Sequence, residues 1–326
     1  MSSQPLGEFD RIARFFAPLA GPGGLGLTDD AAVIACAPGR SLVLTADAMV
    51  EGVHYLPDDP PDFVARKLLR VNLSDLAAMG ARPLYYLLTT ALPATRDEAW
   101  LARFAAGLGE DQQQFGVALL GGDSVATTGP AVLSLTALGE IAGGGEVRRN
   151  GARPGDRVWV SGTIGDAALG LEVLRGGHAR LPAAERAALA RRYQLPEPRT
   201  ALGPRLVGLA HAMCDISDGL LADLGHICDA SGCAAKVTLS TVPLSAAACR
   251  IVNGQPEQAA RLATAGDDYE LLWTAPPEAA SALTSIAVEL SLPLAEIGAI
   301  ETGAGVRLVD AEGQEIPVAA AGYRHF

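Results

Sequence analysis

Strand-like and helix-like segments alternate along the whole chain, and this alternation limits the folds that the chain can adopt. Side chains alternate with a period of two residues in a strand, whereas apolar residues of a helix return every three to four residues. Residues 61–79 and 97–115 follow the helical period, and a glycine stands directly after each. Shorter runs rich in Val, Leu and Ile separate such helices. The pattern predicts an α/β or α+β fold.

The same periodicities predict individual elements. We expect helices at 8–16, 61–79, 97–115, 164–174, 182–193, 219–231, 246–252, 257–265 and 279–290, and strands at 31–36, 41–46, 85–91, 117–120, 130–141, 157–161, 212–216, 237–239, 270–274, 296–300 and 306–309. The 326 residues correspond to about two domains of roughly 150 residues each. The run Gly143-Gly144-Gly145 is the best boundary. We therefore expect an N-terminal domain at 1–145 and a C-terminal domain at 146–326.

The balance of charges excludes several classes of protein. Twenty-five basic residues against 37 acidic residues give a net charge of −12, which argues against a nucleic-acid binder. The only two lysines, Lys67 and Lys236, do not follow a glycine, so a P-loop is absent. No apolar run has the length of a membrane span, and the N-terminus lacks the basic and apolar regions of a signal peptide. We expect a cytoplasmic protein whose five cysteines are reduced.

Aspartates recur at the ends of predicted strands and in turns rich in Gly, Ser and Thr. They are found in Asp29-Asp30, Thr45-Ala46-Asp47, Asn72-Leu73-Ser74-Asp75, Gly121-Gly122-Asp123, Asp215-Ile216-Ser217-Asp218 and Gly266-Asp267-Asp268. Any one of them could cap a helix or stabilise a turn. Together they favour a Mg²⁺ site, because Mg²⁺ is held by a few carboxylates and by substrate phosphates. The flanking glycines would let backbone N–H groups approach those phosphates. The absence of a His/Cys cluster argues against zinc.

At these residues the chain resembles the thiamine-monophosphate kinase family. Its superfamily includes aminoimidazole-ribonucleotide synthetase, selenophosphate synthetase and the hydrogenase-maturation dehydratase. The resemblance covers nearly the whole chain in order, and residues 72–81 and 215–220 carry its most specific motifs. It implies a two-domain fold like that of aminoimidazole-ribonucleotide synthetase, with a C-terminal α/β domain. The N-terminal sheet would form a barrel with its mate across a homodimer.

The resemblance also implies ATP-dependent phosphorylation of thiamine monophosphate to thiamine diphosphate with several Mg²⁺ ions. Carried over position by position, the implied metal ligands are Asp30, Thr45, Asp47, Asp75, Asp123, Asp215 and Asp218. The implied nucleotide contacts are Gly122, Asp123, Arg149 and Ser217, and the implied substrate contacts are His54, Asp267 and Tyr323. No catalytic residue beyond the metal ligands is implied.

Three positions depart from the family pattern. Thr28 stands where a glycine usually precedes the aspartate pair, and Ala46 stands where a hydroxyl residue is common. Asp267 replaces the usual glutamate of the Gly-Glu-Asp-Tyr-Glu-Leu motif, so its reach to a substrate is shorter.

The residues themselves are consistent with direct phosphoryl transfer. A phosphate monoester is largely a dianion at pH 7, because its second pKa is about 6, so the acceptor needs no general base. The difficulty is to bring two polyanions together, and metals held by the aspartates would neutralise their charge. An alternative is another ATP-dependent synthetase of the same superfamily that acts on an amide or a ribonucleotide. Such an enzyme would share the ATP and metal site but have a different acceptor pocket.

Overall fold

The computed structural model describes residues 8–27, 31, 32, 34–318 and 322, and the chain divides into two compact units. The first unit comprises residues 1–76 and 81–144, and the second comprises residues 77–80 and 145–326. Among the described residues, no helix combines the length and the apolar character that crossing a membrane requires.

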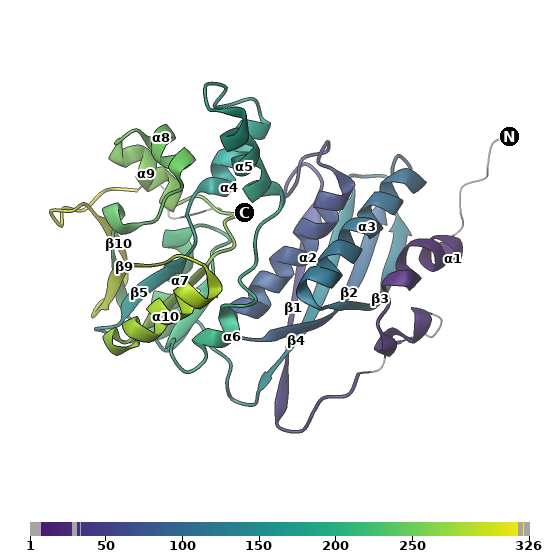
Figure 1. Ribbon diagram of the computed structural model, residues 1–326, viewed down its shortest axis with the longest axis horizontal. Coiled ribbons are helices and arrows are strands. Elements are labelled where there is room, and N and C mark those ends of the chain that lie inside the picture. Colours follow the sequence, from purple (N-terminus) through teal and green to yellow (C-terminus); the bar gives the residue numbers. More distant parts are fainter. Residues whose placement is uncertain (1–7, 28–30, 33, 319–321, 323–326) are drawn as a thin grey trace. The chain divides into compact units, whose positions relative to one another are not determined.

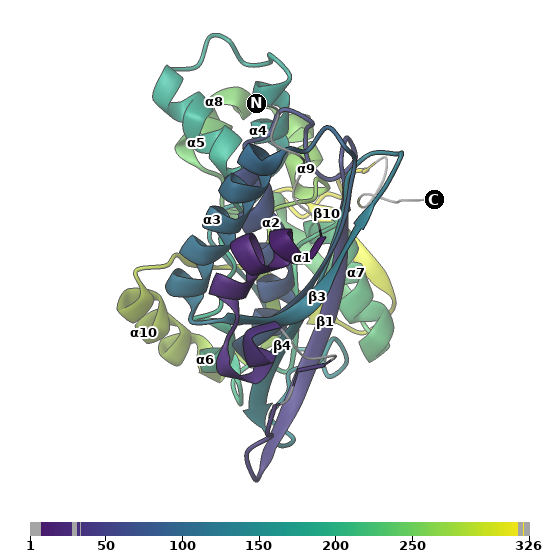
Figure 2. The ribbon, with the colours of Figure 1, turned by 90° about the vertical axis from the view of Figure 1, so that its right-hand side faces the viewer.

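The first unit is a four-stranded mixed sheet covered by helices. Its elements are α1 (Glu8–Arg11), the π-helical turn η1 (Ile12–Phe16), the 3-10 turns η2 (Ala17–Leu19) and η3 (Pro22–Leu27), β1 (Arg40–Val50), α2 (Pro61–Ala78), β2 (Arg82–Leu92), α3 (Glu98–Phe115), β3 (Ala118–Ala126) and β4 (Val132–Ala142). The strand order is β1-β4-β2-β3, in which β3 runs parallel to β2 and the other pairs are antiparallel. Helices α2 and α3 lie side by side across one face of the sheet (Figure 1), and both lie on the same side of it in Figure 2.

The contact between α2 and α3 is very close and contains a buried ion pair. A Cβ atom at Gly107 of α3 would lie 2.3 Å from the carbonyl oxygen of Asp62 in α2, so only glycine fits there. Farther along the helices, Arg70 Nε donates to Asp111 Oδ2 at 2.6 Å, and Arg66 Nε donates to Asp111 Oδ1 at 2.8 Å. The Asp111 side chain is completely buried. Because a buried charge must be paired, Asp111 fixes which residues of the two helices face each other.

The second unit is built on a six-stranded mixed sheet. Its elements are β5 (Arg157–Ser161), α4 (Asp166–Leu174), α5 (Ala183–Gln194), α6 (Gly203–Leu206), β6 (Ala212–Asp215), α7 (Leu220–Ser231), β7 (Ala234–Thr238), the 3-10 turn η4 (Leu239–Thr241), α8 (Ala246–Val252), α9 (Pro256–Ala263), β8 (Leu271–Ala275), the 3-10 turn η5 (Pro277–Ala279), α10 (Ala280–Leu290), β9 (Leu294–Glu301) and β10 (Gly305–Val309). The strand order is β10-β7-β9-β5-β8-β6, with only β10 and β7 parallel. Helix α7 packs on β10, β6 and β7.

Three predictions about strands were wrong. The strand predicted to end at Ala46 continues to Val50, so Asp47 lies inside β1 rather than after its end. Of the predicted strand at 31–36, the described residues 31, 32 and 34–36 are irregular. Ala31, Ala32 and Ile34 line a cavity instead of pairing with a neighbouring strand. The apolar run therefore belongs to a cavity wall rather than to a strand. The strand predicted to end at Leu120 continues to Ala126, so Gly121, Gly122 and Asp123 lie inside β3 rather than in a turn after it. Parallel pairing with β2, which resumes after a register shift, carries the strand through both glycines.

We predict that replacing Asp111 by Asn lowers the free energy of unfolding by about 3 kcal/mol, because the substitution removes the charge opposite buried Arg70. Urea unfolding of the full chain measures the loss. The matched control is Asp62→Asn in α2, whose ion pair with Arg103 is largely exposed on the arginine side and should contribute less than about 1 kcal/mol. Equal losses in the two variants would contradict the importance of the buried pair.

Candidate functional site

Two predicted ligands on β1 lie against the helix α2. Thr45 and Asp47 are alternate residues of β1 and therefore project from the same face of the sheet. Thr45 Oγ1 donates to Asp75 Oδ2 at 2.5 Å, and the Asp47 backbone N–H donates to Asn72 Oδ1 at 3.1 Å. Asn72 and Asp75 are three residues apart in α2, which places them on one side of the helix. The fold thus brings together three predicted ligands, Thr45, Asp47 and Asp75, with Asn72 holding β1 in register.

The charges in this cluster are close together. Burial raises the pKa of Asp47, and a hydrogen bond between its side chain and Asp75 acts in the opposite direction. Negative charges on two neighbouring carboxylates repel each other. A divalent cation relieves the same repulsion, and Mg²⁺ takes carboxylate and hydroxyl oxygens as ligands. The donor set of Thr45, Asp47 and Asp75 therefore fits Mg²⁺.

Asp123 lies apart from this cluster, on the other face of the same sheet. Asp47 is in register with Leu135, which pairs with Leu88, whereas Asp123 pairs with Thr89. Residues paired across neighbouring strands point to the same face of a sheet, and successive residues of one strand point to opposite faces. Asp123 therefore points to the face opposite that of Asp47. Asp123 Oδ1 accepts from the backbone N–H of Ser124 at 2.8 Å.

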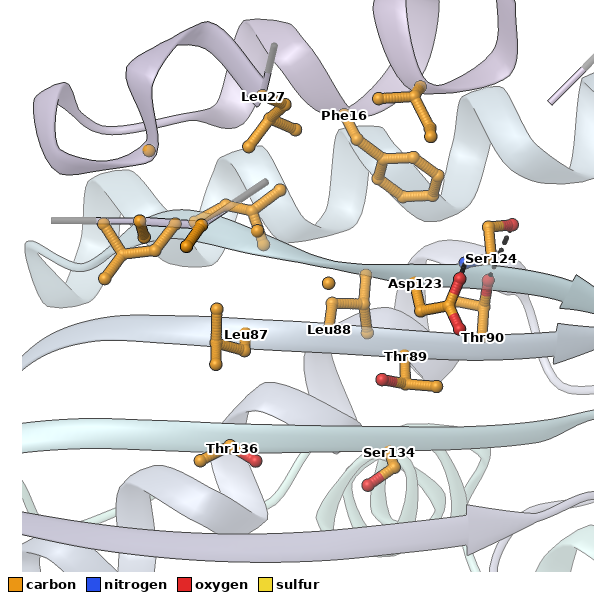
Figure 3. A pocket seen from close by; sticks show the side chains of 18 of the residues that line it. Phe16, Leu27, Leu87, Leu88, Thr89, Thr90, Asp123, Ser124, Ser134 and Thr136 are labelled. Atoms are coloured by element: carbon orange, nitrogen blue, oxygen red, sulfur yellow. Dashed lines mark hydrogen bonds between the residues drawn. The ribbon is translucent and has the colours of Figure 1, made fainter. Parts of the chain in front are cut away.

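A cavity of about 730 Å³ in the first unit includes Asp123 in its lining. Its wall combines hydroxyl side chains of β2, β3 and β4 with apolar side chains of the N-terminal segment. Figure 3 shows Thr89 on β2 and Ser134 and Thr136 on the neighbouring strand β4, with Phe16 and Leu27 on the other side of β3. A cavity lined by both polar and apolar side chains suits a ligand that has both polar and apolar parts.

Gly122 is required by the close approach of β3 to β2. Its φ is +153°, and a Cβ atom there would lie 1.7 Å from the carbonyl oxygen of Leu88. No side chain can be accommodated at that distance without moving the backbone. The glycine therefore lets the two parallel strands stay paired beside Asp123.

In the second unit, β6 ends at the buried residue Asp215, and the turn after it carries Ser217 and Asp218. The backbone N–H groups of Ser217, Asp218 and Gly219 each donate to Asp223 Oδ2 at 3.1 Å. Asp223 is buried in the first turn of α7, where the helix dipole favours a negative charge. These three amides are thus engaged by the protein's own carboxylate, which holds the turn in shape.

Asp223 and His226 were missed in the sequence analysis. The carboxylate oxygens of Asp218 and Asp223 and a ring nitrogen of His226 lie within 4.8 Å of one another. Burial, with a smaller contribution from the charge of Asp218, raises the pKa of Asp223 to about 6. The spacing of Asp218, Asp223 and His226 across the start of a predicted helix is the signal that could have indicated them. The oxygen donors at this turn also fit a divalent cation.

Asp267 lies next to the same turn. Its backbone N–H donates to the carbonyl oxygen of Ser217 at 2.8 Å, and the N–H of Tyr269 donates to that of Ile216 at 2.8 Å. A Cβ atom at Gly266 would lie 2.3 Å from the carbonyl oxygen of Ser217, so the two segments are in direct backbone contact. The fold of the second unit thus places Asp267 beside Ser217 and Asp218.

The remaining predicted residues have different surroundings. His54 Nδ1 accepts from the backbone N–H of Val50 at 3.0 Å, and its carbonyl oxygen accepts from buried Lys67 Nζ at 3.0 Å. The Arg149 carbonyl oxygen accepts from Ser231 Oγ at 3.2 Å. Ala46 is exposed on β1, on the opposite face from Thr45 and Asp47. The predictions for Asp30 and Tyr323, and the departure at Thr28, lie outside the described residues.

Comparison with known proteins gives consistent matches over the whole chain. The family model of the AIR synthase related protein, N-terminal domain, matches residues 28–141, and that of the C-terminal domain matches residues 153–311. The thiamine-monophosphate kinase of Caulobacter vibrioides is 45% identical, covering 99% of this chain and 92% of its own. That of Escherichia coli K12 is 39% identical, with 98% of both chains covered.

Solved structures are similar too. A thiamine-monophosphate kinase from Stenotrophomonas maltophilia superposes with a TM-score of 0.81 at 41% identity, covering 89% of this chain and 91% of its own. AaThiL complexed with AMPPCP and TMP superposes with a TM-score of 0.77 at 31% identity over the full length of both chains. The Escherichia coli hydrogenase maturation protein HypE, at 20% identity and a TM-score of 0.76, shares the fold.

We predict that Gly122→Ala lowers the free energy of unfolding by about 3 kcal/mol, because the new Cβ atom would collide with the Leu88 carbonyl oxygen. The matched control is Gly121→Ala. A Cβ atom there would meet only Leu87 Cδ2 at 3.6 Å, so the change should stay within about 0.5 kcal/mol. Urea unfolding of both variants measures the difference, and equal stabilities would show that the strand approach is not as close as described.

Proposed function

Because the chain belongs to the AIR synthase related proteins and, within them, to the thiamine-monophosphate kinase family, we propose that it transfers a phosphoryl group from ATP to thiamine monophosphate and forms thiamine diphosphate. The observation that carries this proposal is the full-length similarity to a protein solved with AMPPCP and TMP, ligands that correspond to a nucleoside triphosphate and a phosphate acceptor. The fold similarity to HypE alone would support only the architecture.

The chemistry of the acceptor agrees with the side chains that the chain provides. The terminal phosphate of thiamine monophosphate is already largely deprotonated at pH 7, so no side chain has to remove a proton from it. Phosphoryl transfer then depends on positioning and on neutralising charge. The two groups of acidic side chains, at Asp47 with Asp75 and at Asp218 with Asp223, provide places for cations rather than an acid and a base.

The metal proposed for these groups is Mg²⁺. The residues that would hold the several Mg²⁺ ions are Asp30, Thr45, Asp47, Asp75, Asp123, Asp215 and Asp218. When bound, Mg²⁺ would neutralise phosphate charge and align the donor and acceptor phosphates. The oxygen-only donors of the cluster at Thr45, Asp47 and Asp75 support this assignment.

We assign nucleotide contacts to Gly122, Asp123, Arg149 and Ser217, and substrate contacts to His54, Asp267 and Tyr323. The hydrogen bond from the Val50 N–H to His54 Nδ1 has a consequence for this role. Because Nδ1 acts as an acceptor, a neutral His54 carries its proton on Nε2. Nε2 is then the hydrogen-bond donor of the ring.

The proposed assembly is a homodimer in which the sheets of two N-terminal units close a barrel. The face of the sheet opposite α2 exposes apolar side chains, with Leu44 at 61% and Leu87 at 38% exposure. Ala46 pairs with Thr136, which pairs with Leu87, so this face continues across β1, β4 and β2. A second copy would cover these side chains and pair sheet edges that would otherwise remain open.

We predict that Asp75→Asn lowers kcat/KM for thiamine monophosphate phosphorylation by about 100-fold or more, because one charge that holds the cation is lost. A coupled assay of ATP consumption measures it, with thiamine, thiamine monophosphate and an aminoimidazole ribonucleotide precursor as acceptors. The matched control is Asp62→Asn in the same helix, which should keep full activity. EDTA should stop turnover of the wild type, and full turnover in EDTA or in the Asp75→Asn protein would rule out the metal assignment.

We also predict that the wild-type chain has the mass of a dimer by light scattering at micromolar concentration, whereas Leu44→Glu has the mass of a monomer. A charge at Leu44 would be costly to bury in a sheet-to-sheet interface. The matched control is Val288→Glu on α10, which is 75% exposed and should leave the mass unchanged. A wild-type mass of one chain would contradict the proposed assembly.

A further inference from the structure

The segment that leads into β8 has an unusual backbone. Asp267 and Tyr269 adopt positive φ angles of +70° and +51°, in the left-handed region that favours glycine. A left-handed conformation costs a non-glycine residue about 1 to 3 kcal/mol, and it persists only where the surroundings enforce it. Such strain is concentrated at sites that bind ligands.

The alternate residues Asp268 and Glu270 enforce this conformation through the hydrogen bonds of their side chains. Both side chains are completely buried. Asp268 Oδ2 accepts from the Gly165 backbone N–H at 2.7 Å, just before α4. Glu270 accepts from Ser161 Oγ at 2.6 Å and from Arg199 Nε at 2.6 Å.

Arg192 joins the two anchors. Its Nη2 atom donates to Glu270 Oε1 at 2.9 Å and to the carbonyl oxygen of Asp268 at 3.2 Å. The side chains of residues 268 and 270 and the backbone between them are therefore held in one hydrogen-bonded network. Residues 267 and 269 cannot relax without breaking it.

The side chains of Asp267 and Tyr269, on either side of Asp268 in the chain, are only partly buried and lie together. Tyr269 Oη lies 3.4 Å from Asp267 Oδ1, with the hydroxyl as donor. Their backbone N–H groups are bound to the carbonyl oxygens of Ser217 and Ile216. The strained segment thus presents an aromatic ring and a carboxylate side by side, next to the turn that carries Asp218.

Resting on the function proposed above, we propose that Tyr269 acts with Asp267 as the recognition element for the cationic thiazolium ring of the acceptor. An aromatic face and a carboxylate are the two groups that attract such a cation. The ring of thiamine monophosphate is joined to its phosphate by a two-carbon chain. A ring held at Tyr269 therefore leaves the phosphate within reach of the turn at Ser217 and Asp218. The buried side chains of Asp268 and Glu270 hold the backbone of Tyr269 in its left-handed conformation, and this role in recognition is the reason for the strain.

Two variants of the full-length protein separate recognition from strain. Tyr269→Gly removes the ring and also relieves the left-handed backbone, so its melting temperature should not fall. We expect it to raise the KM for thiamine monophosphate about ten-fold, with the KM for ATP unchanged. Tyr269→Phe keeps the aromatic face and should stay within about two-fold of the wild type. Arg191→Ala, an exposed neighbour of Arg192, is the control for a change elsewhere in the unit.

A second measurement tests the charge of the ligand directly. The phosphate ester of a hydroxyethyl-thiazole and its N-methylated, cationic counterpart are compared as competitive inhibitors. The wild type should prefer the cation about ten-fold, and Tyr269→Gly should show little preference. If the wild type is active, and Tyr269→Gly keeps both the KM for thiamine monophosphate and the preference for the cationic inhibitor, the assignment of Tyr269 is overturned. The proposed function would then still stand. A wild type that does not phosphorylate thiamine monophosphate would overturn the proposed function and this assignment with it.

Discussion

The burial of carboxylates beside one another is the constraint that the acidic groups of both units share. In the first unit the Thr45 hydroxyl and a shared hydrogen bond hold Asp75 beside Asp47. In the second unit three backbone N–H groups stabilise Asp223 next to Asp218, although burial still raises its pKa to about 6. Burial raises the pKa of a carboxyl group in both units. The groups that stabilise the carboxylates differ, being side chains in the first unit and a helix N-terminus in the second. Proteins keep such costly arrangements where function needs them.

The backbone around these groups is built for close approach. Gly122 lets β3 run against β2 where a Cβ atom would collide, and Gly266 does the same for the segment beside Ser217. Neither glycine serves mainly as a flexible turn. Each removes a side chain so that two segments distant in sequence can touch. These backbone contacts position the acidic residues next to the two glycines. A glycine-rich motif in the sequence does not by itself reveal such contacts.

Most element boundaries could be predicted, because they depend on local patterns. The helix predicted at 246–252 has the same bounds in the structure, and the helix predicted at 97–115 differs from α3 only in that Asp97 is its N-cap. The failures have tertiary causes. The apolar run at 31–36 predicts a strand, whereas in the structure Ala31, Ala32 and Ile34 line a cavity. The continuation of β3 beyond Leu120 depends on the partner strand β2, which a local pattern cannot indicate.

The sequence by itself determined the alternation of helices and strands, most of the acidic residues of the candidate site and the resemblance that indicates its chemistry, since all three reside in residue types and spacings. Only the tertiary structure decided which acidic residues meet. It set Asp123 on the opposite sheet face from Asp47, and it brought Asp223 to the amides of Ser217 and Asp218. It also gave Tyr269 a left-handed backbone and placed its side chain beside Asp267. Strand register and backbone contacts between distant segments set these positions, and neither can be read from one local stretch of sequence.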